Sequence, residues 1–272
     1  MSVTTGLTYA PVGAFVESSK VRSYEVNRTG HISMGVVLRH LESLATEASA
    51  ALGFDFRWYE EHNAAWVVRE MNLVLGALPG IGDDLRLATW VSDFKRVQAQ
   101  REYAIWLPAG MRQVARASAR WAYVDRIRGV PQRLHDELLG AFAVLGSTMR
   151  PRALSAMTEQ DELLARGELL LTARDYESDS QQHINNCVYA DWLGEGLHLA
   201  LASARDATGL VTRPRFYRIE YVRPAQPGDE IRITTTVARR GSRALAVHQD
   251  VTSATDGALY VRSRSTHLRM EG

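Results

Sequence analysis

The sequence predicts an α+β protein built from two tandem modules, each a long helix wrapped by one curved antiparallel sheet. Three observations support this prediction. A nine-residue segment that begins at Tyr24 recurs at Tyr176, with Tyr, Glu, His and Ile matching in register. An apolar pattern with helical spacing follows the segment in both places. A series of β-rich runs then follows each helix, and repeats in the same order indicate a duplicated unit.

The first module begins with the Tyr24 segment and a helix. Ser33 is a suitable N-cap, because a serine side chain can accept a hydrogen bond from an N–H group of the first turn. Apolar residues follow at helical spacing until Gly53 ends the pattern. Several later runs alternate apolar and polar residues, which indicates strands with one face in the core. The predicted strands are Trp66 to Leu75, Leu85 to Val97, Arg101 to Leu107 and Gln113 to Asp125, with turns at Pro79 to Asp83 and Pro108 to Gly110.

The second module repeats this order. Asn185 or Asn186 is expected to cap its helix, whose apolar positions run toward a stop near Gly209. The Gly-Asp turn at Gly82 recurs at Gly228, in front of the same kind of strand. The predicted strands are Arg215 to Val222, Glu230 to Arg239, Ala244 to Thr252 and Ala258 to Met270.

The duplication also sets the expected boundaries. Residues 129–168 have no counterpart in the second copy, and their prolines and polar stretches predict a connector with one or two short helices. We therefore expect an N-terminal module at residues 1–128, the connector at 129–168 and a C-terminal module at 169–272.

Composition excludes several classes of protein. A hydrophobic fraction of 46% with 23% charged residues is that of a soluble globular protein, and no apolar run approaches the ~20 residues of a membrane helix. A net charge of +1 gives no reason to expect nucleic-acid binding. The N-terminus lacks a secretory signal pattern, and the single cysteine, Cys187, favours a reducing cytoplasm. No zinc-ligand spacing or glycine-rich phosphate loop is present, so we expect no metal and no cofactor.

The duplicated segment differs at the position where chemistry is most plausible. The first copy carries Asn27, whereas the second carries Asp179, followed by Gln181 and His183. Asp179 could activate a water as a general base or attack as a nucleophile. His183 could orient that water or hydrogen-bond a carbonyl, and N–H groups of the helix start could stabilise an oxyanion. The competing interpretation is structural, because Asp and Asn are also good helix caps.

Other candidates have weaker support. Asn185 and Asn186 offer further amides at the helix start, and Glu220 lies in a predicted strand that could face the site. Trp66 could line a pocket, although core packing is the default for a tryptophan. Cys187 could act as a nucleophile, but a cysteine on a predicted helix is more often a small buried apolar residue.

Five motifs extend the comparison over most of the chain. They are Val21 to Val26, Trp66 to Met71, Ala117 to Trp121, Asp179-x-x-x-His183-Ile184-Asn185-Asn186-x-x-Tyr189, and Ile219 to Tyr221. With these motifs the sequence resembles the acyl-acyl carrier protein thioesterases and, through them, the wider hotdog-fold thioesterases. The resemblance implies two hotdog modules, with the acyl pocket largely in the N-terminal one and the chemistry in the C-terminal one.

The sequence departs from the family motif in two places. The family's Asp-x-Asn-x-His corresponds to Asp179, Gln181 and His183, so a longer amide replaces the asparagine. The plant enzymes carry an acidic residue and a cysteine after the Ile-Glu-Tyr strand, where this chain has Pro224 and Ala225, or Ala225 and Gln226 if the gap is placed differently. The resemblance therefore implies hydrolysis centred on Asp179 and gives no support to a cysteine nucleophile.

The leading hypothesis is a cytoplasmic thioesterase of fatty acid biosynthesis and lipid metabolism that acts on acyl groups carried by acyl carrier protein. Its catalytic residues would be Asp179, His183 and Gln181, and we expect Asn185, Asn186, Glu220 and Trp66 to bind substrate. An acyl-CoA thioesterase differs only in the carrier. A non-catalytic protein that binds or senses acyl groups is the alternative from another class. A homodimer is compatible with each of these readings.

Overall fold

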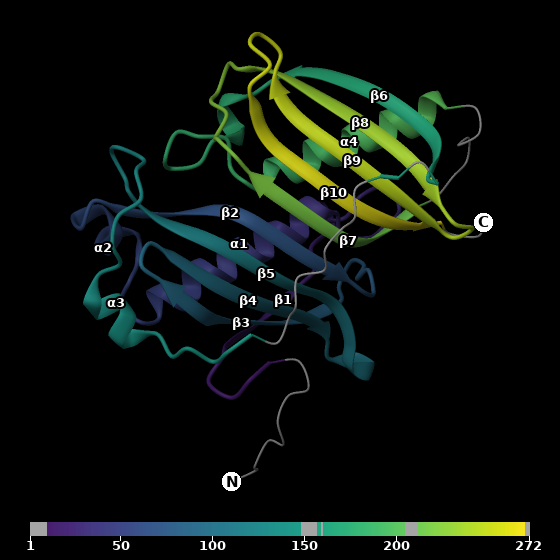
Figure 1. Cartoon of the computed structure of the whole chain (residues 1–272). Coiled ribbons are helices and arrows are strands. Elements are labelled where there is room, and N and C mark those ends of the chain that lie inside the picture. Colours follow the sequence, from purple (N-terminus) through teal and green to yellow (C-terminus); the bar gives the residue numbers. More distant parts are fainter. Residues whose placement is uncertain (1–9, 148–156, 159, 205–211, 270–272) are drawn as a thin grey trace. The chain divides into compact units, whose positions relative to one another are not determined.

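The chain divides into two compact units, residues 1–151 and 152–272. The computed structural model describes residues 10–147, 157–158, 160–204 and 212–269. Within this described part, each unit has one long helix and an antiparallel sheet that curves around it (Figure 1). The predicted fold class is therefore found in both units.

In unit 1 the long helix α1 begins where the sequence predicts. The Ser33 side chain accepts a hydrogen bond from the Val36 N–H at 3.3 Å, and Leu38, Leu41 and Leu44 form the buried side of the helix. The strand order of the sheet is β1-β3-β4-β5-β2. The elements are β1 (Phe15–Lys20), α1 (Met34–Ala50), α2 (Phe56–Glu61), β2 (Ala64–Leu75), β3 (Asp84–Lys95), β4 (Gln98–Leu107), β5 (Arg112–Asp125) and α3 (Asp136–Ala141).

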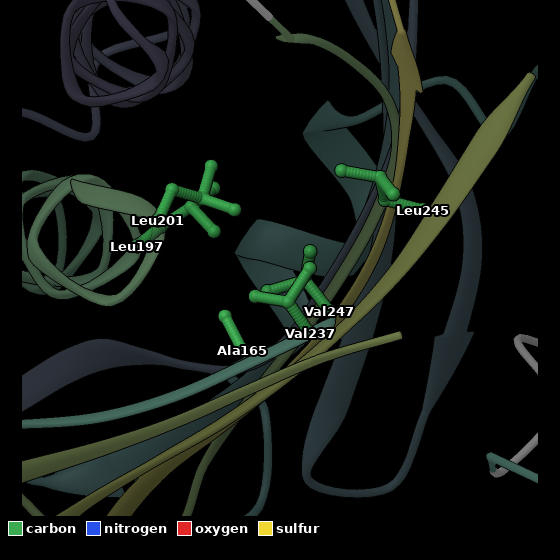
Figure 2. Close-up of a cluster of buried hydrophobic side chains, with 6 residues drawn as sticks. All are labelled: Ala165, Leu197, Leu201, Val237, Leu245 and Val247. Atoms are coloured by element: carbon green, nitrogen blue, oxygen red, sulfur yellow. The ribbon is translucent and has the colours of Figure 1, made fainter. Parts of the chain in front are cut away.

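Unit 2 repeats this topology strand for strand. Its order is β7-β10-β9-β8-β6, so each strand occupies the position of its counterpart in unit 1. A cluster of buried apolar side chains joins helix α4 to the sheet (Figure 2). Its members are Ala165, Leu197, Leu201, Val237, Leu245 and Val247. The elements are β6 (Glu162–Thr172), α4 (Val188–Ser203), β7 (Thr212–Tyr221), β8 (Glu230–Arg240), β9 (Ala244–Ser253) and β10 (Leu259–Arg269).

Helix α4 lies unusually close to β6. A Cβ atom added at Gly167 would stand 2.8 Å from the Ala200 Cβ and 2.9 Å from its Cα. Only glycine fits this crossing, because any side chain would push the helix away from the strand. The position of α4 therefore depends on the absence of a side chain at residue 167.

Substitution Gly167→Ala is expected to destabilise the protein by about 1–3 kcal/mol, the usual cost of overpacking a core. Urea unfolding would measure this change in the free energy of unfolding. Gly194→Ala is the matched control, since Gly194 lies exposed on the same helix with nothing within 4 Å of a new Cβ. That change should stabilise the helix by up to ~1 kcal/mol. Equal effects of the two substitutions would contradict the close packing at Gly167.

The eight strands predicted from the sequence are found, with ends that differ by three residues or fewer. Helix α4 ends at Ser203, earlier than the predicted stop at Gly209, which lies outside the described residues, as does Met270. Strands β1 and β6 were not predicted. Both lie at sheet edges, and the Leu-, Ala- and Glu-rich sequence of β6 has high helix propensity, which strand pairing overrides.

The expected connector at 129–168 differs from the observed structure at its second end. Its described residues include a short helix, α3, in line with the expectation. Residues 162–168, however, belong to β6, which pairs with β8 along its whole length. The boundary expected at 169 therefore falls inside a strand. Among the described helices, none is long and apolar enough to cross a membrane.

Candidate active site

The two copies of the duplicated segment adopt the same loop. In unit 2 the Asp179 N–H donates to the His183 carbonyl oxygen at 2.8 Å, and in unit 1 the Asn27 N–H donates to the His31 carbonyl oxygen at 2.9 Å. This closure places Asp179, Gln181 and His183 within one tight loop, as the sequence predicts. Gln182 has a φ of 62° there.

The side chain at the first loop position serves the loop in both copies. Asn27 Oδ1 accepts a hydrogen bond from the Thr29 N–H at 2.9 Å, and Asp179 Oδ1 accepts one from the Gln181 N–H at 2.8 Å. Asparagine and aspartate therefore close the loop equally well. The structural interpretation accounts for an oxygen at this position, but it gives no reason for the negative charge of Asp179.

Three side chains of this loop have polar atoms available to a ligand. The Gln181 amide and the His183 ring form no hydrogen bond with any residue that the structure describes, and Asp179 uses only Oδ1. All three residues are partly buried. A carboxylate, an amide and an imidazole thus lie on one loop, each with polar atoms that no described residue engages, which is what a site for a polar reacting group requires.

Glu177 anchors this loop to its surroundings. Its Oε2 accepts a hydrogen bond from the Arg174 N–H at 2.8 Å, and its Oε1 accepts one from Trp192 Nε1 at 3.1 Å. The Trp192 bond ties the loop to helix α4. In unit 1 the Arg22 N–H binds Glu25 in the same way at 2.7 Å. Glu177 was not among the predicted site residues, although the glutamate at this position in both copies of the segment was the available signal.

Tyr189 fixes the other side of the loop. Its buried hydroxyl accepts a hydrogen bond from the Ala225 N–H at 2.8 Å, while the Ala225 carbonyl oxygen accepts one from the Ile184 N–H at 2.9 Å. Burial raises the pKa of the Tyr189 phenol, so the hydroxyl stays protonated. Ala225 therefore positions the loop through its backbone.

Substitution Tyr189→Phe is expected to leave the buried Ala225 N–H without its partner and to destabilise unit 2 by about 1–3 kcal/mol. The Ala225 carbonyl oxygen also accepts the Ile184 N–H. We therefore expect the loop to lose its fixed position and turnover to fall by roughly tenfold. Thermal unfolding and steady-state kinetics would measure the two effects. Tyr176→Phe is the control, since Tyr176 is 77% exposed; if both variants behaved alike, Tyr189 would have no positioning role.

The cap of helix α4 differs from the prediction, because the N-cap residue is Cys187 and neither Asn185 nor Asn186. Asn185 Oδ1 accepts a hydrogen bond from the Cys187 N–H at 2.8 Å, and Asn186 Oδ1 lies 3.4 Å from the Cys187 Sγ. The N–H groups of Val188 and Ala190 are bound within the same turn. These N–H groups are therefore not available to an oxyanion, which corrects part of the expectation. Cys187 is fully buried, as a small apolar residue would be.

Glu220 does not face this loop. Its neighbour Tyr221 is buried, and the Tyr221 hydroxyl donates to the Asn186 carbonyl oxygen at 3.2 Å. Side chains alternate along a strand, so Glu220 points to the opposite face of the sheet, where it pairs with Arg218 at 2.9 Å. The expectation that Glu220 faces this loop is not met, because one sequence does not show which face of β7 meets the helix, and its role in substrate binding stays a prediction.

Trp66 lies in unit 1, within an aromatic cluster. Its Nε1 donates to the Tyr59 hydroxyl at 3.0 Å, and its ring packs on Tyr123 with 4.9 Å between centroids. Core packing therefore explains much of its environment. Its role in substrate binding stays a prediction.

Two family models match the chain. The model described as the acyl-ACP thioesterase N-terminal domain matches residues 13–142, and the model of the thioesterase superfamily matches residues 181–260. The second match begins at Gln181, so it covers His183 and helix α4. Together the two matches follow the division of the chain into two units.

Named proteins and solved structures agree with these models. The chain is 23% identical over 266 residues to a chloroplastic palmitoyl-acyl carrier protein thioesterase of Gossypium hirsutum, covering 92% of this chain and 63% of that protein. An Arabidopsis thaliana protein of the same description is 24% identical with the same coverage. The chain thus spans about 63% of the length of these relatives.

Two solved structures have the same fold over nearly the whole chain. The 12:0-ACP thioesterase from Umbellularia californica superposes with a TM-score of 0.78 and 18% identity, covering 94% of each chain. An acyl-ACP thioesterase from Bacteroides thetaiotaomicron gives a TM-score of 0.72 and 19% identity, covering 93% of this chain and 97% of the other. This likeness confirms the predicted fold of two hotdog modules.

Proposed function

Because the chain is related to the acyl-acyl carrier protein thioesterases, we propose that it hydrolyses a fatty or related acyl thioester carried on an acyl carrier protein. The observation that carries the proposal is the pair of matching loops. Asn27 closes the loop of unit 1 and Asp179 closes that of unit 2 with the same backbone hydrogen bonds. The carboxylate is therefore not needed for folding, which supports a chemical role.

In the proposed reaction Asp179 acts on water. Its carboxylate removes a proton from a water molecule, and the resulting hydroxide attacks the carbonyl carbon of the thioester. The tetrahedral intermediate then expels the thiolate, which takes up a proton, so the products are a free acid and the carrier thiol. Direct attack by Asp179 would instead form a mixed anhydride that water cleaves. Single turnover in ¹⁸O-labelled water tests for direct attack, since label enters the Asp179 carboxylate only when water cleaves the anhydride at the aspartyl carbonyl carbon.

His183 and Gln181 are proposed to position the reacting groups. The two side chains share a loop with Asp179 and are not engaged by other described residues. An imidazole N–H or an amide N–H can donate to the thioester carbonyl oxygen as negative charge develops there. Asn185 and Asn186 lie just before α4, where Asn185 Oδ1 accepts from the Cys187 N–H and the Asn186 carbonyl oxygen accepts from the Tyr221 hydroxyl.

Release of thiol from a panel of acyl chains on both carriers tests the proposal. We expect turnover on acyl-carrier protein substrates that exceeds turnover on the matched acyl-CoA substrates. A clear preference for CoA would make the protein an acyl-CoA thioesterase. Saturable acyl binding without thiol release at any chain length would make it an acyl-binding protein and would end the catalytic proposal. The cytoplasmic location and the homodimer remain predictions, and sedimentation would test the latter.

A further inference from the structure

A positive charge lies inside unit 1. Arg101 belongs to β4 and is only 9% exposed. It shares its face of the strand with Tyr103 and Ile105, which are each 1% exposed. Its partners across the sheet are Val91 on β3 and Ala119 on β5. A guanidinium group therefore projects into the core face of the sheet, where arginine is rarely found.

The described part of the protein gives this guanidinium few hydrogen-bond acceptors and no negative charge. Arg101 Nη1 donates to the Thr89 Oγ1 at 3.4 Å, and the group lies 5.6 Å from the centre of the Phe142 ring. In the part of the chain that the structure describes, it forms no ion pair with a carboxylate. Burial lowers the pKa of Arg101, yet arginine stays protonated in proteins. A buried charge without a counterion is costly, and the cost is recovered only when an acceptor binds it.

A second polar group in this interior also lacks a partner. The Tyr123 hydroxyl is buried and forms no hydrogen bond among the described residues. Phe142 links the two groups, because its ring centre lies 5.6 Å from the Arg101 guanidinium and it packs against the buried cluster that contains Tyr123. The Arg101 guanidinium and the Tyr123 hydroxyl therefore belong to one region of unit 1.

The rest of this region is apolar. Ala115, Ala117 and Ala119 line the core face of β5 with methyl groups, and each is fully buried. The aromatic cluster of Phe54, Tyr123 and Phe142 continues the apolar surroundings. Apolar surroundings favour a hydrocarbon chain over a small inorganic anion, which would lose its hydration with little in return.

We propose that the interior of unit 1 binds an acyl chain that carries an acceptor oxygen away from its thioester, and that Arg101 and Tyr123 bind this oxygen. A hydroxyl, keto or carboxylate oxygen supplies the shared chemistry, since each can accept from a guanidinium and a phenol. An unsubstituted alkyl chain would leave both donors unmatched. This inference rests on the proposed function, because it names the class of acyl group that the same protein would hydrolyse.

The test compares acyl thioesters that differ only at the distal end. Unsubstituted, ω-hydroxy, ω-oxo and ω-carboxy acyl groups on the carrier, from octanoyl to hexadecanoyl, would be assayed by thiol release. At its best chain length the wild-type protein should prefer one oxygenated series over the unsubstituted one by about ten- to a hundredfold in kcat/KM. The oxygenated series with the highest kcat/KM identifies the kind of oxygen that is bound.

Arg101→Met should remove this preference by lowering kcat/KM for the oxygenated series. The variant should also keep or raise the thermal midpoint, because an apolar side chain replaces an unpaired buried charge. Tyr123→Phe should lower the preference by a smaller factor. Arg86→Met is the matched control, since Arg86 is exposed on the neighbouring strand β3, and it should change neither quantity.

Binding of free acids separates this inference from the proposed function. An ω-hydroxy fatty acid should raise the thermal midpoint of the wild-type protein more than the unsubstituted acid does, and Arg101→Met should abolish the difference. If no substrate releases thiol, the proposed function fails and this shift still decides the inference. Equal handling of both series by wild type and by Arg101→Met, in kinetics and in thermal shift, would overturn the inference while leaving thioester hydrolysis intact.

Discussion

Asp179→Asn is expected to reduce thiol release by at least a hundredfold, the lower end of what a general base contributes. The fold should survive, because the new side chain keeps the oxygen that accepts the Gln181 N–H, and Asn27 fills the same role in unit 1. Steady-state assays on the best acyl-carrier substrate would measure the loss. Urea unfolding should give a free energy within ~0.5 kcal/mol of wild type, as for most substitutions that keep their contacts.

The reciprocal change provides the control. Asn27→Asp places a carboxylate in the loop of unit 1, where Thr29 N–H and Oγ1 both donate to the residue 27 oxygen. We expect turnover of this variant to equal that of wild type. Normal turnover in Asp179→Asn would show that the carboxylate has no catalytic role, and restored turnover in the double variant would place the chemistry in unit 1.

The unfolding free energy is expected to fall by roughly 3 kcal/mol between pH 6.5 and pH 4 through His267 alone. His267 lies inside unit 2 with 3% exposure, and burial lowers its pKa from 6.5 to about 4. In this pH interval His267 therefore binds a proton in the unfolded chain but stays neutral in the folded protein. The stabilisation is fully present above pH 6.5 and is lost as the pH falls through 4. Urea unfolding across this range measures it.

His267→Gln should remove this part of the pH dependence. The neighbours of the ring are uncharged over the interval, since Ser265 Oγ lies 3.1 Å from Nε2 and the Tyr217 ring lies 5.6 Å away. His198→Gln changes an exposed histidine on α4 and should leave the pH dependence as in wild type. If the unfolding free energies of wild type and His267→Gln changed with pH in parallel, His267 would keep an ordinary pKa in the folded protein.

Local signals in the sequence were sufficient for the repeated elements and for the candidate loop. Ser33 caps α1 because a cap depends only on residues within one turn. The predicted strands were found because alternation is a property of the strand itself. Asp179, Gln181 and His183 come together because they are near neighbours in a loop that one backbone hydrogen bond closes. The predicted family resemblance is confirmed by the matches over both units.

Other features depended on contacts between distant residues. Strands β1 and β6 exist through their single neighbours β3 and β8, which no local pattern identifies. The anchoring role of Tyr189 depends on its hydrogen bond with Ala225, which is 36 positions away in the sequence. Glu220 lies on the face of the sheet opposite to the expected one, because the residue pattern of its strand is compatible with either orientation.

The sequence by itself determined the duplication, the order of helix and strands in each unit, and the single acidic residue that distinguishes the two loops. Only the tertiary structure decided which side of each strand is buried, and with it the positions of Arg101, Tyr123 and His267 in the interior. The physical reason is that burial is a property of what covers a side chain. The pattern of a strand separates its two faces, but the helix that packs on one of them selects the core.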